Sequence, residues 1–578
     1  MLLRKIGGQR ASTMTKFPRD VGVRAASSAT TGFFQDPPVL GNQFDDDEAL
    51  VSLIRRLVPS ATRNAMNLDA ELHRFGARVV APDILEACHD AEYNPPRHIP
   101  IDAWGRRVDK LLMTQGWTFM KKVAAEEGLI ALAYDPTHGE YARVQQFAKL
   151  YLFSPSSAVF TCPLAMADGA ARLIEQQPQK SANLRHAFDR LVSRDPALAW
   201  TSGQWMTERT GGSDVSKTET VATPHPTLPS AHLLHGFKWF SSATDSEMTL
   251  LLARLGADNP RLSLFFGHVH TAADKQTLNG IRIQRLKPKY GTHALPTAEL
   301  ELDGMVGELV GEPGRGVATI ATVLNITRIH TAVNAVSFFR RALATADAFA
   351  TKRVAFGKTL IDHPLHKKTL WDLHVDYRRV LHLVFTAVAM LGRVEAASRA
   401  ASGSHEDDEH LLRLLTPVVK AWCSKVSLAA ISECCEAMGG AGYIEDVGLG
   451  RLLRDCQAQT IWEGTTNVLS LDVRKLCLKD TSYTTAWSAF VDRQLRDVPA
   501  SNRCKTAVAM RAAALVARMG AGSVEAEARD ILFDLGETTS AALLLAHAQA
   551  TGNAKDWEVA QRVCCGDVPA DILGRPRL

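Results

Sequence analysis

Apolar side chains recur with a helical period over most of this chain. Between residues 45 and 190 they fall at helical spacing, as in Leu50 to Leu57, and paired prolines divide the stretch into separate helices. The same period returns in the C-terminal half, where Leu370 to Val388 and Leu414 to Val426 each show one continuous apolar face. The helical pattern of residues 311–480 therefore predicts an antiparallel four-helix bundle.

The stretch from residue 195 to residue 310 follows a different pattern. From Ala298 to Asp303 apolar and acidic residues alternate strictly, so we expect one buried face and one solvated face. Pro224, Pro226 and Pro229 mark a hairpin loop. The segment therefore predicts a compact β-domain, a barrel or a sandwich. Its other predicted strands are Leu233 to Phe240, Met248 to Leu255, Leu262 to Val269 and Ile281 to Leu286.

The length of 578 residues is too great for a single hydrophobic core, so several domains are expected. An alanine-rich helical region follows Thr481. The predicted fold class is α+β with mostly α content, in which the β-domain lies between two helical parts. The predicted parts are a transit peptide or disordered tail (1–31), an N-terminal helical domain (32–194), the β-domain (195–310), the bundle (311–480) and a further helical extension (481–578).

Composition and charge exclude several classes of function. Hydrophobic residues make up 46% and charged residues 22%, as in ordinary globular proteins, and the net charge of +4 gives no argument for nucleic acid. The longest apolar run, Val380 to Leu391, is interrupted by His382 and is too short to span a bilayer. The ten cysteines lack metal-ligand spacing. We therefore expect no transmembrane segment, no metal site and reduced, buried thiols.

The N-terminal 31 residues differ from the rest. They contain six basic residues, a single acid, Asp20, and many Ser and Thr, which is the composition of an organelle transit peptide. A disordered basic tail, or an upstream extension if Met14 is the true start, would have the same composition. The last three residues, Pro576 to Leu578, only weakly resemble a peroxisomal signal. The sequence therefore predicts a mitochondrial location, with cytoplasmic and peroxisomal locations as alternatives.

A polar, glycine-rich segment, MTERTGGSDV (Met206 to Val215), is the first candidate for chemistry. Gly212 lets backbone N–H groups approach a ligand closely, while Thr207 and Ser213 offer hydroxyl groups. Alone, such a segment is more typical of a tight turn or a helix cap. Four further motifs follow it in order: KWFSS (Lys238 to Ser242), RVAFGK (Arg353 to Lys358), MGGAGY (Met438 to Tyr443) and IWEGTTN (Ile461 to Asn467).

These five motifs resemble, in content and order, the signature segments of the acyl-CoA dehydrogenase family. The resemblance covers residues 33–480 and agrees with the helical–β–helical organisation. Arg209 stands where the family signature T-E-P-x-A-G-S-D has proline. This substitution, the N-terminal segment FFQDPPVLGNQF and the C-terminal extension together resemble the AidB-like, adaptive-response branch.

The resemblance implies FAD as the cofactor and assigns residues to it. Met206 and Thr207 would contact the flavin ring, and Gly212 and Ser213 its ribityl-phosphate side. Phe240 takes the place of a tryptophan that stacks on the flavin, so the aromatic face is kept and the indole N–H is lost. Further implied flavin positions are Ser242, Glu436, Gly439, Gly440, Thr465 and Asn467.

Two positions imply a flavin that is shared between subunits. Arg353 and Phe356 match family residues that reach the FAD of a neighbouring subunit, and a guanidinium group there could bind a pyrophosphate with two hydrogen bonds. Without the other motifs, an arginine beside a helix C-terminus would explain the segment equally well. The resemblance therefore implies a homotetramer.

Glu463 is the candidate catalytic base. Oxidation of an acyl thioester between its α and β carbons requires a base for the α proton, while a hydride leaves the β carbon for flavin N5. A desolvated carboxylate, with Ile461 and Trp462 as an apolar wall, would have the raised pKa that this step needs. A glutamate at a helix start would instead have a lowered pKa. One group in the family places its base just before the arginine of the first bundle helix, but here that position is Thr327, which cannot serve.

Two functions of different classes follow from the resemblance. The first is an FAD-dependent acyl-CoA dehydrogenase that passes electrons to a flavoprotein acceptor. The second is a weakly catalytic flavoprotein that binds acyl-CoA or DNA in a regulatory or protective role. Residues 480–578 hold 11 basic and 12 acidic residues, so DNA binding is disfavoured. A flavin oxidase acting on nitro or amino compounds is a third possibility, which the retained Glu463 disfavours.

Overall fold

The computed structural model describes residues 35–271, 277–400, 406–520 and 524–573. Residues Pro38–Leu578 form one compact unit. Residues 1–31, for which the sequence predicts a transit peptide or tail, and the C-terminal Pro576–Leu578 lie outside the described residues. The domain boundaries drawn from the sequence within the compact unit stay predictions.

The N-terminal part is mainly helical, as predicted. The first helix among the described residues begins at Glu48, where Asp47 caps the free backbone N–H of Leu50. The prediction of helices alone between residues 45 and 190 is wrong in one place, because a β-hairpin, β1 (Arg97–Ile101) and β2 (Arg107–Leu112), follows the helix that ends at Tyr93. The helices are α2 (Glu48–Leu57), α3 (Ser60–Ala65), α4 (Leu68–Arg78), α5 (Pro82–Tyr93), α6 (Gln115–Glu126), α7 (Ala142–Phe153), α8 (Thr161–Gln176) and α9 (Ala182–Leu191).

The β-domain is a closed barrel. Five strands pair in the order β6–β4–β5–β9–β7, and β7 pairs with β6 to complete the ring. β3 joins the edge of β6 in parallel, and β8 joins β9. The strands are β3 (Ser202–Trp205), β4 (Val221–Pro224), β5 (Ala231–Ser242), β6 (Met248–Leu255), β7 (Leu262–His268), β8 (Ile281–Leu286) and β9 (Thr297–Val310).

The barrel is buried on two sides, which explains its long apolar runs. On β6, Leu251 points into the barrel core, whereas Leu250 and Leu252 pack against α8 and the first bundle helix. The strict alternation predicted for Ala298 to Asp303 is wrong at Glu299. This carboxylate is buried, because Arg285 and Lys287 reach across from the neighbouring chain segment to pair with it.

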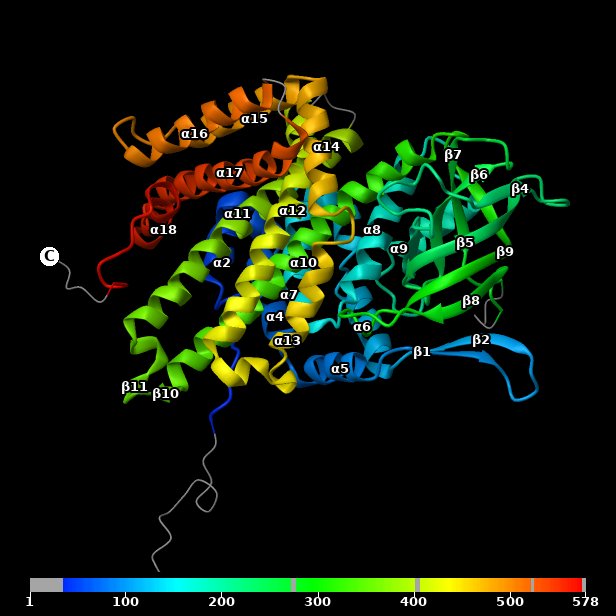
Figure 1. Cartoon of the computed structure of the whole chain (residues 1–578), viewed down its shortest axis with the longest axis horizontal. Helices are drawn as coiled ribbons and strands as arrows, with labels where there is room; N and C mark the ends of the chain where they lie inside the picture. Colours follow the sequence, from blue (N-terminus) through cyan, green and yellow to red (C-terminus); the bar gives the residue numbers. More distant parts are fainter. Residues whose placement is uncertain (1–34, 272–276, 401–405, 521–523, 574–578) are drawn as a thin grey trace, which may run out of the picture. The chain divides into compact units, whose positions relative to one another are not determined.

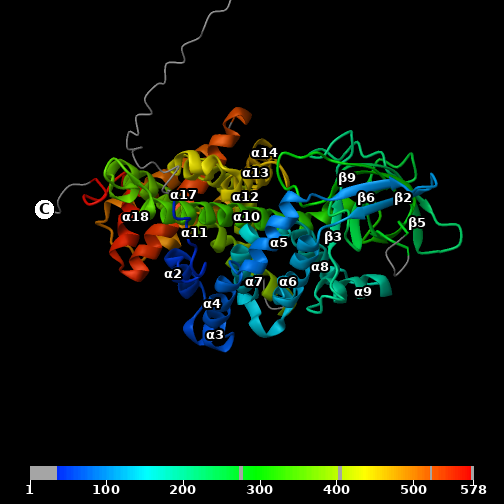
Figure 2. The same ribbon diagram turned by 90° about the horizontal axis from the view of Figure 1, so that it is seen from below.

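Three long helices and two shorter ones form the bundle. The β-domain lies at one end of it (Figure 1). The hairpin β10 (Val354–Ala355) and β11 (Lys358–Thr359) lies at the opposite end, and α4, α6 and α7 pack along one side (Figure 2). α11 and α12 are long and apolar enough to cross a membrane, but 67% and 78% of their apolar windows are buried inside the protein, as in core helices. The bundle helices are α10 (Gly316–Lys352), α11 (Pro364–Ala400), α12 (Glu406–Ala437), α13 (Leu449–Gln459) and α14 (Thr466–Lys479).

The extension is helical, as predicted, and packs on the bundle. Its third helix, α17, approaches α12 closely, because a β-carbon on Gly536 would lie 2.6 Å from the Trp422 side chain. At another contact, Trp487 donates its indole N–H to Thr539 Oγ1 at 2.9 Å. The fold class predicted from the sequence is confirmed. The helices of the extension are α15 (Ser482–Leu495), α16 (Arg503–Gly520), α17 (Ala528–Thr551) and α18 (Ala554–Cys565).

Candidate functional site

Glu463 lies in the turn between α13 and α14, in a backbone conformation that non-glycine residues rarely adopt. Its φ is +59°, and the next residue, Gly464, has a φ of +105°. The carboxylate Oε2 accepts a hydrogen bond from Thr327 Oγ1 of α10 at 2.6 Å. The alternative of a glutamate held by the free N–H groups of a helix start is therefore wrong, since its partner is a hydroxyl on another helix.

The surroundings of Glu463 give it the properties of a base. Burial raises the pKa of its carboxyl group, and the Thr327 hydroxyl and the charges of Arg328 and Lys420 oppose that rise only in part. Arg328 donates to the backbone carbonyl of Glu463 at 3.1 Å, and Lys420 donates to that of Gly464 at 2.6 Å. These two side chains fix the turn from both neighbouring helices.

Lys420 and Thr327 are the residues of this site that sequence reasoning missed or set aside. Lys420 is fully buried, and burial lowers its pKa to about 7. A lone lysine within the apolar stretch of α12 is the signal that could have found it. Thr327 cannot serve as a base, but it is the residue that touches the base.

The apolar wall predicted for Glu463 is different in the structure. Ile461 is 57% exposed and so does not enclose the carboxylate. Trp462 is half-buried and packs against the main core, where its indole N–H donates to Gln459 Oε1 at 3.0 Å. The desolvation of Glu463 comes instead from its place between α10 and α12.

The MTERTGGSDV segment lies along β5 of the barrel. The N–H of Trp239 donates to the carbonyl of Thr207 at 2.9 Å, and the buried ion pair of Glu208 with Lys238 joins the same two segments at 2.7 Å. A β-carbon on Gly211 would lie 2.2 Å from the backbone carbonyl oxygen of Asp214, so this tight turn needs a glycine at that position, and one on Gly212 would lie 3.0 Å from Thr207 Oγ1. The first and second motifs are therefore one structural unit.

The residues of this unit fit a flavin. Phe240 is 47% exposed and offers an open aromatic face, with the Lys287 ammonium group 5.3 Å from its ring. Met206 and Thr207 are half-buried beside it in the same unit, and Gly212 and Ser213 are exposed. Ser242 Oγ lies 3.0 Å from Thr297 Oγ1 and keeps a hydroxyl at the end of β5. Aromatic face, hydroxyl groups and open glycine backbone are the groups that a flavin and its phosphates require.

A partly buried lysine, Lys289, lies at the barrel end of the candidate site. Lys289 donates to Thr297 Oγ1 at 3.1 Å, and burial lowers its pKa to about 8. Cys162, at the start of α8, lies within range of the charges of both Lys289 and Glu463, and burial raises the pKa of its thiol to about 12. Lys289 at the barrel end of the candidate site and Glu463 therefore both lie near the start of α8.

The remaining predicted residues fall in two other places. Thr465 and Asn467 follow Glu463 and are exposed, and Asn467 Oδ1 accepts from Arg529 of α17 at 3.1 Å. Arg353 and Phe356 lie in the β10–β11 segment, at the end of the bundle away from the β-domain (Figure 1). Phe356 is 98% exposed, with a φ of +49°.

Glu436, Gly439 and Gly440 belong to the same far end. α10 and α12 run in the same direction, so the C-terminal end of α12, which carries Glu436, lies beside the β10–β11 end of α10. Gly439 has a φ of +59°, and a β-carbon on either glycine would meet nothing within 4 Å. Within one chain, these residues are not brought together with Phe240.

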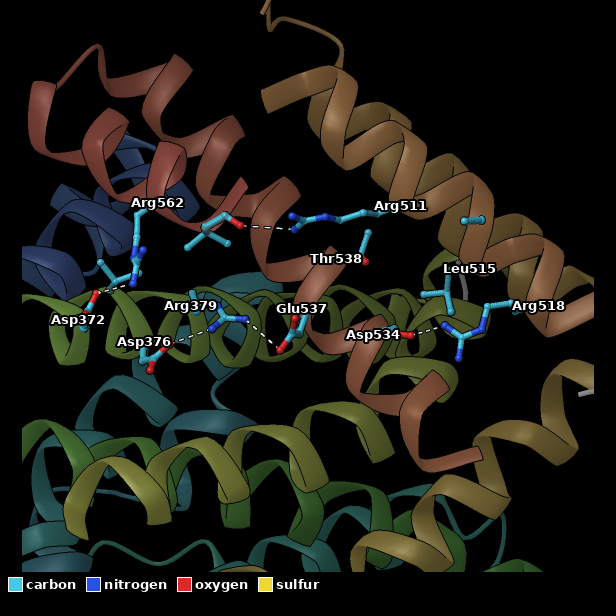
Figure 3. A pocket seen from close by; sticks show the side chains of 13 residues that line it. Asp372, Asp376, Arg379, Arg511, Leu515, Arg518, Asp534, Glu537, Thr538 and Arg562 are labelled. Carbon is cyan, nitrogen blue, oxygen red and sulfur yellow. Dashed lines mark hydrogen bonds and ion pairs between the residues drawn. The ribbon is translucent and has the colours of Figure 1, made fainter. Parts of the chain in front are cut away.

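A cleft of about 710 Å³ lies between α11 and the extension, away from Glu463 (Figure 3). It is lined by four arginines and four acids, so its charges cancel. Three of the arginines pair with these acids and Arg511 donates to backbone carbonyls, so the cleft has no excess of positive charge for an anion. The partners are Asp372 for Arg562, Asp376 and Glu537 for Arg379, Asp534 for Arg518, and the carbonyls of Val563 and Cys564 for Arg511.

Four basic residues of the extension, Arg493, Arg496, Arg503 and Lys505, could form a local DNA-binding patch, and three of them have partners. Arg493 pairs with Asp407 at 3.8 Å, Arg503 pairs with Asp567, and Lys505 donates to the carbonyl of Val498 at 2.7 Å. This pairing weakens the case for a duplex-binding surface.

Four family models match consecutive parts of the chain. They are the adaptive response protein AidB N-terminal domain (residues 35–194), the acyl-CoA dehydrogenase middle domain (203–305), the acyl-CoA dehydrogenase C-terminal domain (314–477) and the acyl-CoA dehydrogenase 11 C-terminal domain-like model (493–570).

Similar proteins extend over nearly the whole chain. Acyl-CoA dehydrogenase family member 11 of Caenorhabditis elegans is 41% identical over 571 residues, which is 94% of this chain and 90% of that protein. AidB of Escherichia coli (strain K12) is 29% identical over 450 residues, 76% of this chain and 80% of its own length. The crystal structure of Caenorhabditis elegans ACDH-11 in complex with C11-CoA has a TM-score of 0.88, 40% identity and 95% coverage of both chains.

These similarities run through the N-terminal helices, the barrel, the bundle and the extension in one order. The family cofactor, FAD, matches the open aromatic and hydroxyl groups at the end of β5. The chain therefore belongs to the acyl-CoA dehydrogenase family, in its AidB-like branch, and is an FAD-dependent oxidoreductase acting on acyl-CoA.

Proposed function

We propose that this protein oxidises an acyl-CoA thioester between its α and β carbons, with Glu463 as the base that takes the α proton. The observation that carries this proposal is the desolvated carboxylate of Glu463, whose pKa is raised and whose partner is the Thr327 hydroxyl. FAD, when bound, supplies through flavin N5 the acceptor for the β-hydrogen and its electron pair.

Thr327 can serve both protonation states of the base. Its Oγ1 lies 2.6 Å from Glu463 Oε2 and 3.1 Å from the backbone carbonyl of Val323. Before proton transfer the hydroxyl donates to the carboxylate. Afterwards the protonated carboxyl group can donate to Oγ1, while the hydroxyl hydrogen turns to the Val323 carbonyl. The proton taken from the substrate is thus held at Oε2.

Lys420 and Arg328 position the base. Both donate to carbonyls of the turn that carries it, at 2.6 Å and 3.1 Å, so the strained backbone at Glu463 is fixed before substrate arrives. Their positive charge also keeps part of the carboxyl population ionised in spite of burial. We regard both as positioning residues.

We further propose a medium-length acyl chain, near eleven carbons, as the substrate. The support is the relative ACDH-11, whose structure contains C11-CoA and which is 40% identical to this chain. An electron-transferring flavoprotein would then reoxidise the flavin. Mitochondrial targeting stays a prediction of the sequence.

We also propose a homotetramer in which Arg353 and Phe356 reach the flavin of a neighbouring subunit. The support is their distance from the barrel within one chain, together with the 98% exposure of Phe356. Val354 of the same hairpin is 56% exposed as well, and neighbouring exposed apolar side chains mark a surface that a ligand or a partner covers.

The test is an anaerobic titration of the purified, FAD-loaded protein with saturated acyl-CoAs of graded length. We expect bleaching of the flavin absorbance to be strongest near eleven carbons and to be lost in Glu463→Gln. Perturbation of the flavin spectrum without bleaching, at every chain length, would contradict the dehydrogenase and favour a regulatory acyl-CoA-binding protein.

A further inference from the structure

Three of the ten cysteines meet where α16 begins and α18 ends. Cys504, in the first turn of α16, has its Sγ 3.3 Å from the Sγ of Cys565, the last residue of α18. Cys564 is next to Cys565 in sequence, and its thiol also lies within range of Cys504. All ten cysteines are free thiols, and eight of them are buried.

The geometry allows a bond between Cys504 and Cys565. A disulfide has a sulfur–sulfur distance of about 2.05 Å, so the two sulfurs need to approach by little more than 1 Å. Cys565 is followed by Gly566, whose left-handed conformation ends the helix, and Cys504 lies just after the helix-capping side chain of Asn502. Because both thiols are at helix ends, side-chain rotation and a small shift of one helix end suffice.

We propose that Cys504 and Cys565 form a peroxide-sensitive disulfide that links α16 to α18. In the first step the Cys565 sulfur attacks a hydroperoxide, the O–O bond breaks, and a sulfenic acid and water (or an alcohol) form. In the second step the Cys504 sulfur attacks the sulfenic sulfur, the S–S bond forms, the S–O bond breaks and water leaves. Two thiols are oxidised and one peroxide is reduced.

The exposure of the two thiols determines that Cys565 reacts with the peroxide first and Cys504 second. Cys565 is half-buried and so accessible to peroxide, whereas Cys504 is only 1% exposed. Burial, together with the neighbouring thiol groups, raises the pKa of Cys504 to about 11. It is therefore a poor first nucleophile, and it acts on a sulfur that is already oxidised and in contact with it. The positive charge of Arg503, the residue before Cys504, opposes this rise in pKa only in part.

The disulfide would fix the relative position of two helices that line the cleft described above. α16 contributes Arg511 and Leu515 to the cleft and α18 contributes Arg562, while α11 forms its opposite wall (Figure 3). Since Cys504 and Cys565 are 61 residues apart, the bond closes a long loop around α17. Oxidation would therefore restrain the relative motion of α16 and α18 without changing a contact of Glu463.

The test uses the full-length, FAD-loaded protein. It is treated with a small excess of hydrogen peroxide, alkylated and digested, and the peptides are identified by mass spectrometry. We expect one crosslinked peptide pair, Cys504–Cys565, lighter by two hydrogens, and a higher Tm that a dithiol reverses. Cys565→Ser and Cys504→Ala should each abolish the crosslink and the Tm shift. Cys435→Ser, which removes the other half-buried thiol, should keep both.

Three outcomes would overturn the proposal. They are a crosslink between Cys504 and Cys564, crosslinks between separate chains only, and a sulfinic acid on Cys565 with Cys504 still alkylated. Far-ultraviolet circular dichroism of both variants should match that of the wild type, so that loss of the crosslink is not explained by unfolding.

Discussion

At the scale of single residues, the candidate base is controlled by groups distant in sequence. Thr327 and Lys420 reach Glu463 and its turn from α10 and α12, and both favour the ionised carboxylate against the effect of burial. Changing either should therefore move the pH at which the base becomes active, without removing the base.

Thr327→Val should shift the acidic limb of the kcat/KM profile to higher pH. The substitution removes the hydrogen bond to the carboxylate, so the pKa of Glu463 rises further above its usual value and the base is already protonated at a higher pH than in the wild type. A hydrogen bond to a charged group contributes about 1.5 kcal/mol, so activity below the limb should fall roughly tenfold. Thr331→Val is the matched control, because Thr331 Oγ1 bonds only within its own helix, to the Thr327 carbonyl at 2.8 Å. An identical shift in both variants would refute this role of Thr327.

Substitution of Lys420 separates its charge from its hydrogen bond. Lys420→Gln should move the acidic limb in the same direction, because the positive charge that favours ionised Glu463 is gone while an N–H remains for the Gly464 carbonyl. Lys420→Met should move the limb and also lower kcat at its plateau, since the turn loses its support. A pH–rate profile of each variant provides the measurement. Plateau values of kcat that are equal in Gln and Met would show that the hydrogen bond to Gly464 is dispensable.

At the scale of elements, the packing of the extension depends on one close approach. A β-carbon on Gly536 of α17 would lie 2.6 Å from the Trp422 ring of α12. Gly536→Ala should therefore destabilise the protein by about 1–3 kcal/mol, as overpacking of a core does. Gly520→Ala, at the end of α16, is the control, because a β-carbon there meets nothing within 4 Å. Urea unfolding measures both, and equal stability of the two variants would contradict the close packing.

Some elements can be predicted from the sequence because local pattern alone determines them. Met248 to Leu255 and Ile281 to Leu286 are continuous or alternating apolar runs between turn residues, and the strands β6 and β8 have these bounds. The hairpin of β1 and β2 gives no such signal, since Trp104 at its tip is 85% exposed and Arg107 bonds the distant carbonyl of Ile283 at 2.7 Å. Pairing of this kind depends on contacts that no local window contains.

In the candidate site, too, the sequence predicts the local motif but not the contacts between distant residues. Glu463 is predictable, because its motif is local. Its hydroxyl partner is 136 residues away and the lysine of its turn is 44 residues from Gly464, so neither contact can be read from spacing. Glu299 illustrates the electrostatic form of the problem, since an acid in an alternating strand looks solvated until Arg285 and Lys287 are seen to cover it.

At the scale of the whole molecule, a buried histidine pair joins the N-terminal part, the bundle and the extension. The rings of His382 of α11 and His547 of α17 are 4.5 Å apart, and His547 Nε2 lies 3.0 Å from Ser52 Oγ of α2. Burial lowers the pKa of His547 to about 4, and the charges of Arg56 and Arg378 lower it while that of Asp556 raises it.

The stability of the protein should therefore fall as the pH is lowered from 6.5 toward 4. The imidazole of His547 takes a proton in the unfolded chain near its ordinary pKa of about 6.5, but in the folded chain only near 4, so acid favours unfolding. The pH dependence of Tm measures this, and His547→Gln should have a flatter profile between these values. If both proteins show the same slope, the histidine pair is not responsible.

The separation of the predicted flavin residues is also a property of the whole molecule. Phe240 and Glu463 belong to the barrel end of the bundle, whereas Phe356 and Gly439 belong to the other end. One chain does not bring the two groups together, in agreement with the proposal that the flavin site is shared between subunits.

The central claim, that Glu463 removes the α proton, is tested most directly by stopped-flow flavin reduction under anaerobic conditions. If Glu463 is the base, wild-type protein reduces its flavin more slowly with an acyl-CoA deuterated at the α carbon than with the unlabelled compound. Glu463→Gln then binds the same acyl-CoA without reducing the flavin. Flavin reduction by Glu463→Gln at close to the wild-type rate, with the isotope effect intact, would contradict this claim.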